Sequence, residues 1–251
     1  VPPYLKFLRG LVDSDDFSLN ISREMLQSSP TMRRINDNLE KKFIAHIKDM
    51  KEKDPTKYLS FYKVYGEQLK FGIYSSYGQK KDLLIDTLLF HSLNNADKMI
   101  SLKEYKDAMK KDQKSIYYAS GDSLEAIKML PEMEKYKKNG LDVLLFDQKI
   151  DEFAIMMVGD YDKVKFLSIS EDNKDEISKE DAARLSSLTA SNKRVLDDIK
   201  EALGTNVDEV ALSSKLVDSP VCISTKQGLS LGMEKTLKDQ PGNNEEAKAS
   251  K

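Results

Sequence analysis

The stretch Ile116-Tyr117-Tyr118-Ala119-Ser120-Gly121-Asp122-Ser123-Leu124-Glu125 marks a change in the hydrophobic period of the chain. Its apolar run at residues 116–119 is typical of a strand, and the Gly-Asp-Ser that follows is typical of a turn. Apolar residues then recur with a helical period over residues 124–129, and Asp122 with Glu125 three positions later resembles a capping box. The stretch therefore predicts a strand that leads directly into a helix.

The same alternation continues along the chain. We expect a helix at residues 133–138, a buried strand at 143–146, a helix at 150–158 and a strand at 164–169. Strands that alternate with helices predict a small α/β unit, with right-handed crossovers between its strands. Gly121 follows the first strand alone, without the glycine spacing of a phosphate-binding loop, so the pattern does not indicate a nucleotide site there.

Upstream of this unit the period is helical. Apolar residues at steps of three and four predict a helix over residues 32–50, a second from Asp54-Pro55 to Leu69, and a third that carries Leu83, Leu84, Leu88 and Leu89. Residues 71–78 read as a loop, and residues 102–109 as a short final helix. Three consecutive helices with short connections predict a helical coil.

Downstream, a densely charged stretch at residues 171–181 indicates a domain boundary. We expect one long amphipathic helix from Leu185 to Leu203, strands at residues 207–212 and 221–224, and a disordered tail from residue 240. Leu229, Met233 and Leu237 share one helical face, and too little chain follows to cover it. An exposed apolar face of this kind marks an interaction site.

Composition narrows the class of protein. The 251 residues carry a net charge of -2, with 33% charged and 39% hydrophobic residues, which is typical of a soluble globular protein. A nucleic-acid binder needs clustered, uncompensated basic residues, and no apolar run is long enough to span a membrane. Cys222 has no cysteine to pair with, so a reducing cytosol fits, and we read it as a small buried hydrophobe. His46 and His91 lie far apart in sequence, so we expect no metal site.

A polar cluster near the start of the chain is a candidate phosphate-binding site. Helical spacing brings Asn20, Arg23 and Gln27 into one neighbourhood. A guanidinium is always charged and presents a planar fork of donors that fits phosphate oxygens. In the alternative, Arg23 pairs with Glu24 or Asp16 on a solvated face and does nothing more.

The string Val-Asp-Ser-Asp-Asp-Phe-Ser-Leu-Asn-Ile-Ser-Arg-Glu-Met-Leu-Gln at residues 12–27 resembles the catalytic loop in the middle domain of the ninety-kilodalton heat-shock chaperone family. Residues 113–118, 149–153 and 212–220 are similar to the same family. The resemblance implies that Arg23 contacts the terminal phosphate of ATP held by a separate N-terminal domain, with Asn20 and Gln27 as polar companions. The leucine-proline usual before this motif is Phe17-Ser18 here, which would loosen the entry to the loop.

The resemblance also implies a domain organisation and partners. Residues 1–30 would end a larger α/β unit that carries the arginine loop, 31–111 would form the helical coil, 112–172 the small α/β subdomain, and 173–251 the start of a C-terminal α+β domain. The family's ATP-binding domain would precede Val1 and its dimerisation helices would follow Lys251. ATP and Mg²⁺ would then belong to the full-length ATPase, a homodimer, and this chain alone would bind neither and hydrolyse nothing.

Client proteins and the chain's own N-terminal domain are the partners that the resemblance implies, in a cytoplasmic and bacterial setting. The client-contact surface would include Leu229, Met233 and Leu237, together with Glu152 and Phe153. Two alternatives remain at this point. One is the transducer domain of a DNA-acting ATPase, of the topoisomerase or mismatch-repair type, which would need a basic groove. The other is a scaffold with no link to a nucleotide.

Overall fold

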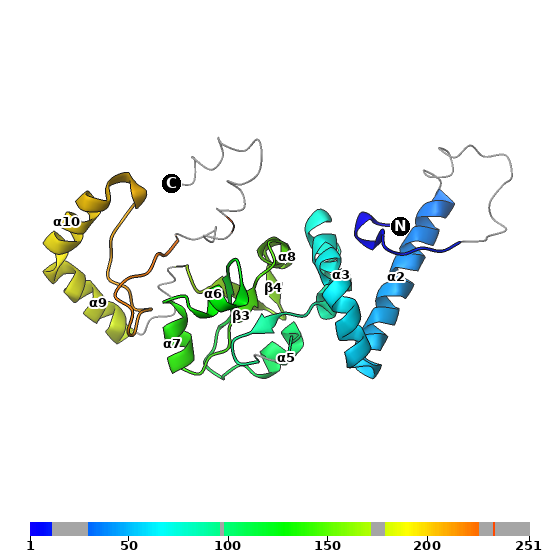
Figure 1. The fold of residues 1–251 in the computed structure, drawn as a ribbon, viewed down its shortest axis with the longest axis horizontal. Helices are drawn as coiled ribbons and strands as arrows, with labels where there is room; N and C mark the ends of the chain where they lie inside the picture. The colour runs from blue at the N-terminus through cyan, green and yellow to red at the C-terminus, as the bar shows by residue number, and fades with distance from the viewer. Residues whose placement is uncertain (12–29, 96–97, 172–178, 226–232, 234–251) are drawn as a thin grey trace. The chain divides into compact units, whose positions relative to one another are not determined.

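The computed structural model describes residues 1–11, 30–95, 98–171, 179–225 and 233 (Figure 1). They form the mixed α/β fold that the sequence predicts. The chain divides into two compact units. The first consists of Val1–His91, Asn95–Ala108 and Ile150–Val164, and the second of Ser92–Asn94, Met109–Lys149 and Lys165–Lys251.

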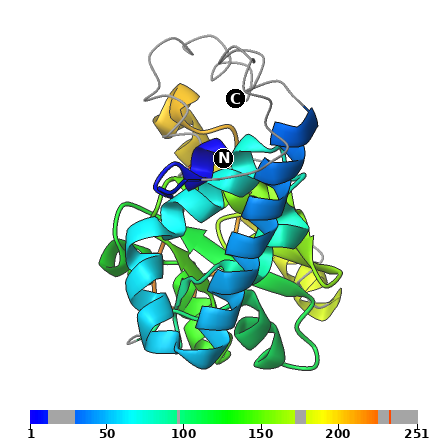
Figure 2. The same cartoon turned by 90° about the vertical axis from the view of Figure 1, so that its right-hand side faces the viewer.

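Two long helices of the first unit, α2 (Pro30–Lys53) and α3 (Pro55–Ser75), lie side by side (Figure 2). Asp54 separates the two helices and caps the N-terminus of α3, where its side chain accepts a hydrogen bond from the backbone N–H of Lys57 at 3.0 Å. Both helices bury apolar side chains, whereas Leu39, on the predicted apolar face of α2, is 37% exposed; the buried residues are Ile44 and Ile47 on α2, and Tyr58, Tyr62, Leu69 and Ile73 on α3.

The loop predicted at residues 71–78 is wrong over its first part, because α3 continues to Ser75. Gly72 lies inside this helix. A Cβ atom there would lie 2.8 Å from the ring of Tyr4 and 2.9 Å from Leu84, so the glycine allows close packing and does not break the helix.

The third helix of the predicted coil is also shorter than expected. It consists of α4 (Lys81–Leu84) and a turn of 3₁₀ helix, η2 (Ile85–Thr87), after which the chain is extended at Leu88. Phe90 and Ile100 exchange two backbone hydrogen bonds of 2.8 Å just before β1 (His91–Ser92). Leu88 and Leu89 are buried in extended chain. A short run of leucines can be buried in either an extended segment or a helix, so the pattern alone does not distinguish the two.

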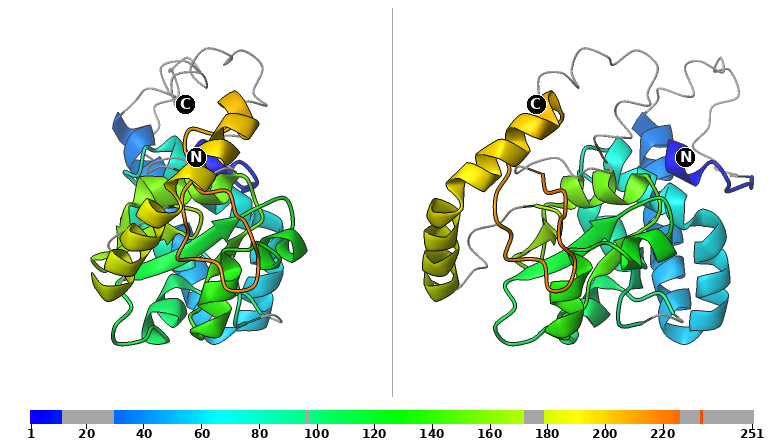
Figure 3. Two further views of the ribbon diagram at one scale, coloured as in Figure 1. Left: turned by 90° about the vertical axis from the view of Figure 1, so that its left-hand side faces the viewer. Right: turned by 60° about the vertical axis from the view of Figure 1, so that its left-hand side comes forward.

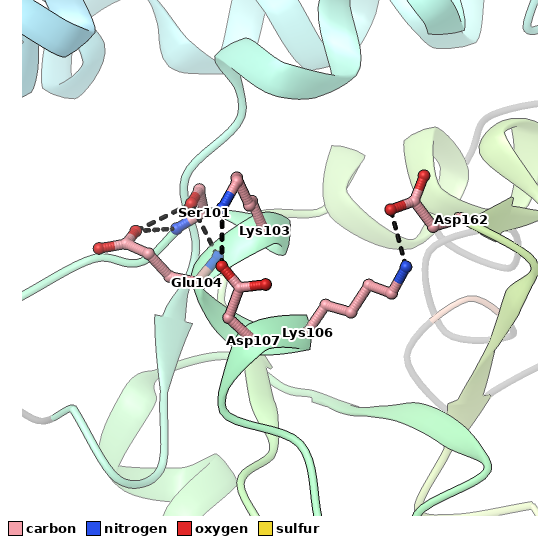
Figure 4. A network of polar contacts seen from close by, with 6 residues as sticks. All are labelled: Ser101, Lys103, Glu104, Lys106, Asp107 and Asp162. Carbon is pink, nitrogen blue, oxygen red and sulfur yellow. Dashed lines mark hydrogen bonds and ion pairs between the residues drawn. The ribbon is translucent and has the colours of Figure 1, made fainter.

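Helix α5 (Leu102–Asp107) begins with a capping box (Figure 4). The hydroxyl of Ser101 accepts from the backbone N–H of Glu104 at 3.2 Å, and the Glu104 carboxylate accepts from the backbone N–H of Ser101 at 2.8 Å. Lys103 pairs with Asp107 on the same helix, and Lys106 pairs with Asp162, each at 2.7 Å. Asp162 follows β4 (Asp160–Tyr161), so the last of these pairs joins two segments of the first unit.

The second unit contains most of the predicted α/β alternation, but the helix predicted at residues 150–158 belongs to the first unit. Strand β2 (Ser115–Ser120) pairs in parallel with β3 (Leu144–Phe146) on one side and with β5 (Val164–Ser168) on the other, with Tyr118 opposite Leu144 and Ile116 opposite Phe166. Helices α6 (Leu124–Lys128) and α7 (Met133–Lys138) lie between β2 and β3 in sequence. They contribute to one hydrophobic core, made of Tyr117, Ala119, Ile127, Met133, Tyr136, Val143, Leu145, Leu167 and Ile169.

The predicted cap of α6 is off by one residue. Ser123, not Asp122, occupies the cap, and its hydroxyl accepts from the backbone N–H of Ala126 at 3.2 Å. Serine and aspartate serve equally well at this position, so the pattern alone does not choose between them.

The long helix predicted between Leu185 and Leu203 is two helices, α9 (Lys179–Ser191) and α10 (Lys193–Leu203), with a bend at Asn192 (Figure 3). A short 3₁₀ turn, η4 (Gly204–Asn206), follows. The strands predicted at residues 207–212 and 221–224 are wrong. The chain there is irregular, with a single bridge that joins Glu171 and Thr225.

Within the described ranges, no helix combines the length and apolarity needed to cross a membrane. Nor do the described residues bring three or more His, Cys, Asp or Glu side chains together in a way that could hold a metal ion.

Candidate functional site

The predicted phosphate-contacting residues Asn20, Arg23 and Gln27 lie in the stretch 12–29, outside the described residues. What the structure describes is the chain on either side of this stretch. Both flanks belong to the first unit, one at residues 1–11 and the other at the start of α2.

The N-terminal flank is held by aromatic packing. Phe7, just after the 3₁₀ turn η1 (Pro3–Leu5), stacks on the ring of Tyr65 with 4.1 Å between ring centroids. It also meets Phe43 and Phe61 edge-on, at 5.9 and 6.1 Å. Each aromatic pair contributes about 0.5–1.5 kcal/mol beyond the burial of its area. Since Phe43 is on α2 and the other two are on α3, this flank is fixed to both helices.

A buried carboxylate adds polar contacts to the same flank. Glu40, on α2, accepts a hydrogen bond from the hydroxyl of Tyr4 and pairs with the ammonium of Lys80. Burial and the neighbouring Glu40 raise the pKa of the Tyr4 hydroxyl, so it remains a donor at neutral pH. The N-terminal flank of residues 12–29 is therefore fixed to α2 and α3, and the other flank is the start of α2 itself.

The other predicted site residues in the first unit are Glu152 and Phe153, on α8 (Ile150–Val158). Glu152 is buried, so it contributes no exposed surface. Phe153 is half-buried, and its ring centroid lies 5.5 Å from that of Tyr74 on α3. The ring centroid of Tyr74 in turn lies 6.4 Å from that of Phe71. Only Phe153 of the predicted pair therefore reaches an exposed cluster.

We call this cluster the aromatic patch: Phe71, Tyr74, Phe153 and Met156. Phe71, Tyr74 and Met156 are all exposed, and Met156 lies three residues after Phe153 on the same face of α8. Phe71 and Tyr74 escaped the sequence analysis because residues 71–78 were expected to form a loop. Extending the helical period of α3 past Leu69 would have placed both on one face.

A desolvated ion pair sets the position of α8 against α3. The ammonium of Lys70 lies 2.5 Å from the carboxylate of Asp151, with only 2% and 1% of these side chains exposed. The same ammonium lies 4.9 Å from the ring centroid of Phe90 and 5.9 Å from that of Tyr62. Cation–π contacts are strongest where water is excluded, so these two rings add to the attraction between Lys70 and Asp151 in holding the lysine in place.

Two further contacts hold the C-terminal end of α8. Lys81 donates to the backbone carbonyl of Val158 at 3.0 Å, which satisfies a helix-end acceptor and places positive charge at the negative end of the helix dipole. Gly78 approaches the carbonyl of Met157 so closely that an added Cβ atom would lie 2.5 Å from its oxygen. The aromatic patch therefore lies on two helices that are tightly fixed to each other.

Of the remaining predicted site residues, Leu229 and Leu237 lie outside the described residues. Met233 is described and is buried, with 5% of its surface exposed. This differs from the exposed apolar face that the sequence predicted at Met233.

The comparison with known proteins is decisive about the family. Residues 1–251 match the family described as Hsp90 protein. The chain belongs to the Hsp90 family. This confirms the resemblance seen in the arginine loop, and it favours a chaperone over the transducer domain of a DNA-acting ATPase.

Several bacterial relatives within the family are similar over almost the whole chain. A chaperone protein HtpG from Clostridium acetobutylicum is 42% identical over 244 residues, which are 97% of this chain and 39% of that protein. One from Clostridium perfringens is 41% identical over 251 residues, and one from Bacillus subtilis is 39% identical over 241. The chain spans about two-fifths of the length of these relatives, with 40% and 38% of the last two covered.

Proposed function

We propose that this Hsp90-family chain is part of an ATP-dependent chaperone that binds and remodels client proteins. The observation that carries the proposal is the match over residues 1–251, supported by relatives that are named chaperone protein HtpG. The whole protein would act as a cytoplasmic homodimer. The chain alone would have no ATPase activity, since ATP and Mg²⁺ would be held by a separate N-terminal domain.

Within that protein, Arg23 would contact the γ-phosphate of ATP, and Asn20 and Gln27 would orient it. A guanidinium supplied from another domain stabilises the charge that develops on the transferred phosphoryl oxygens. The anchored flanks support this role. Phe7 packs against both α2 and α3, and α2 begins directly after residues 12–29. Residues 12–29, which carry Arg23, would therefore be held at both ends by a rigid base and would lose less conformational entropy on reaching the nucleotide.

The test is Arg23→Ala in the full-length protein. An arginine of this type is worth about 10³–10⁵ in turnover where it has been measured. We expect ATP turnover to fall by at least about 100-fold, with nucleotide affinity nearly unchanged, because the adenine and the other phosphates are bound elsewhere. Arg34→Ala is the matched control, because Arg34 is an exposed arginine on α2. Unchanged turnover in Arg23→Ala would refute the assignment.

We also propose that clients contact the aromatic patch, and that Leu229 and Leu237 contribute to client binding; the buried Met233 is left out of this surface. Partly exposed aromatic side chains fixed on rigid helices bind apolar segments with little loss of conformational entropy. Glu152 lies beneath this surface, and its part would be to hold α8 in place.

Charged substitutions test the client surface. In the full-length protein, Phe71→Asp combined with Met156→Asp should weaken the suppression of client aggregation without lowering ATP turnover. Met129→Asp is the control, because Met129 is a highly exposed methionine on the other unit. If the double variant and the control suppress aggregation equally well, the aromatic patch is not a client surface.

A further inference from the structure

Residues 207–225 are an irregular segment of the second unit, drawn in orange in Figure 3. No apolar side chain in this segment is buried, and Val221 and Ile223 are 73% and 66% exposed. The one buried residue is a lysine, Lys215, which is 8% exposed. Val207, Val210, Leu212 and Leu216 are half-buried, so apolar contacts hold the segment only in part and its polar contacts help to decide where it lies.

The densest of these contacts is made by Glu134, on α7. One oxygen of its carboxylate accepts hydrogen bonds from three successive backbone N–H groups, those of Val217, Asp218 and Ser219, at 3.0, 2.8 and 3.2 Å. Its other oxygen accepts from the hydroxyl of Ser219. Consecutive N–H groups that converge on one point form a receptor for an anion. Here the receptor is occupied by a side chain of the same chain.

Two other contacts tie the segment to the chain that follows β5. Lys215 donates to the backbone carbonyl of Glu171. The backbone N–H of Thr225 donates to the carbonyl of Ser170 at 3.2 Å. Both partners are neighbours in sequence, so these contacts fix the segment at one edge, and the side chain of Glu134 joins it to α7.

We propose that Glu134 and the turn formed by Val217, Asp218 and Ser219 are a releasable latch that holds the 207–225 segment on α7. Glu134 is only half-buried, so water can reach its carboxylate and replace its hydrogen bonds as they break. No residue of the segment belongs to the hydrophobic core around Tyr117 and Met133, so release would leave that core intact. The latch is thus a device for local opening, and it does not depend on the role of Arg23.

The chemistry of the latch is specific to a carboxylate of this length. In Glu134→Gln the amide oxygen can still accept from the backbone N–H groups and the amide NH₂ can donate to the Ser219 hydroxyl, but the charge that strengthens each bond is lost. Ser219→Asp would place a second carboxylate against Glu134 and open the latch by repulsion.

Hydrogen–deuterium exchange on the full 251-residue chain tests the proposal. In Glu134→Gln, the amides of Val217, Asp218 and Ser219 should exchange at least about tenfold faster than in the parent chain, while β2 and α7 keep their protection. Ser219→Asp should give the same pattern. Glu125→Gln, which removes an exposed carboxylate on α6, should change none of these rates.

Two results would overturn the latch. One is unchanged exchange at residues 217–219 in both Glu134→Gln and Ser219→Asp. The other is an equal loss of protection in β2 and in the segment, which would mean that the contact supports the whole unit and is not a local device.

Discussion

The α3–α8 contact and the 207–225 segment are both held by charged side chains, but in opposite surroundings. Lys70 and Asp151 are removed from water and enclosed by Tyr62 and Phe90. Glu134, which holds the turn of Val217, Asp218 and Ser219, is only half-buried. A fully buried charge that loses its partner has no water to replace it, whereas a carboxylate that water can reach does. The Lys70–Asp151 pair should therefore break only when the protein unfolds, whereas the contact between Glu134 and residues 217–219 should open while the rest of the fold stays intact.

The largest expected effect is at the buried pair. Lys70→Ala leaves the carboxyl group of Asp151 enclosed without its partner, and we expect it to lower the free energy of unfolding by about 3–5 kcal/mol. Lys103→Ala, which removes one member of the exposed pair with Asp107, should cost less than about 1 kcal/mol. Urea denaturation of the chain measures both. Equal losses would mean that burial does not distinguish the two pairs.

The close approach of Gly78 to α8 gives the next largest effect. Gly78 and Gly159 both have positive φ angles, 76° and 79°, but only Gly78 has a backbone oxygen where a Cβ atom would lie. Gly159→Ala should cost about 1 kcal/mol for its conformation alone, and Gly78→Ala roughly 2–4 kcal/mol. Denaturation midpoints compare the two variants. If they are equally stable, the packing of Gly78 against Met157 is not tight.

A smaller loss is expected at the start of α5. Ser101→Ala removes the hydroxyl that caps the helix and breaks the reciprocal bonds with Glu104, at a cost of about 1 kcal/mol. Thermal unfolding measures it, with Ser60→Ala as the control, because the Ser60 hydroxyl donates only to a carbonyl within its own helix. A Ser101→Ala variant as stable as the control would show that the cap is dispensable.

The mildest perturbation is acid, which acts on the latch. The hydrogen bonds from Ser219 and the backbone lower the pKa of Glu134 from 4.5 to about 2. A lowered folded pKa means that its stabilisation is complete above pH 4.5 and is lost as the pH falls toward 2. Glu132 and Glu171, which face Lys215, have pKa values raised by burial and so protonate earlier. Carboxyl NMR across this range should find Glu134 the last of the three to titrate; an ordinary pKa at Glu134 would contradict the latch.

The sequence predicts elements best where local signals agree. The expected bounds of α7 and α8 match the structure, because each helix has a clear apolar face and a turn or strand next to it. The sequence does not predict the end of α3, because Gly72 is typical of a loop. In the structure Gly72 lies within the helix and leaves room for the ring of Tyr4. The strands expected at residues 207–212 and 221–224 were wrong because alternation does not provide a partner strand.

The candidate site divides in the same way. The arginine motif and Phe153 could be picked out from sequence because they lie in strings that resemble the family. The Lys70–Asp151 pair and the contact between Glu134 and Ser219 could not, because each joins residues far apart in sequence that only the tertiary fold brings together. Met233 was expected to be exposed, and its burial depends on a packing partner that a helical period does not reveal.

The central claim is that Arg23 acts on a nucleotide held by another domain. The most direct measurement is the ATPase activity of the isolated N-terminal domain of the same protein when this chain is added. The account predicts stimulation by the parent chain and by Arg34→Ala, and none by Arg23→Ala. Equal stimulation by the parent chain and Arg23→Ala would contradict it.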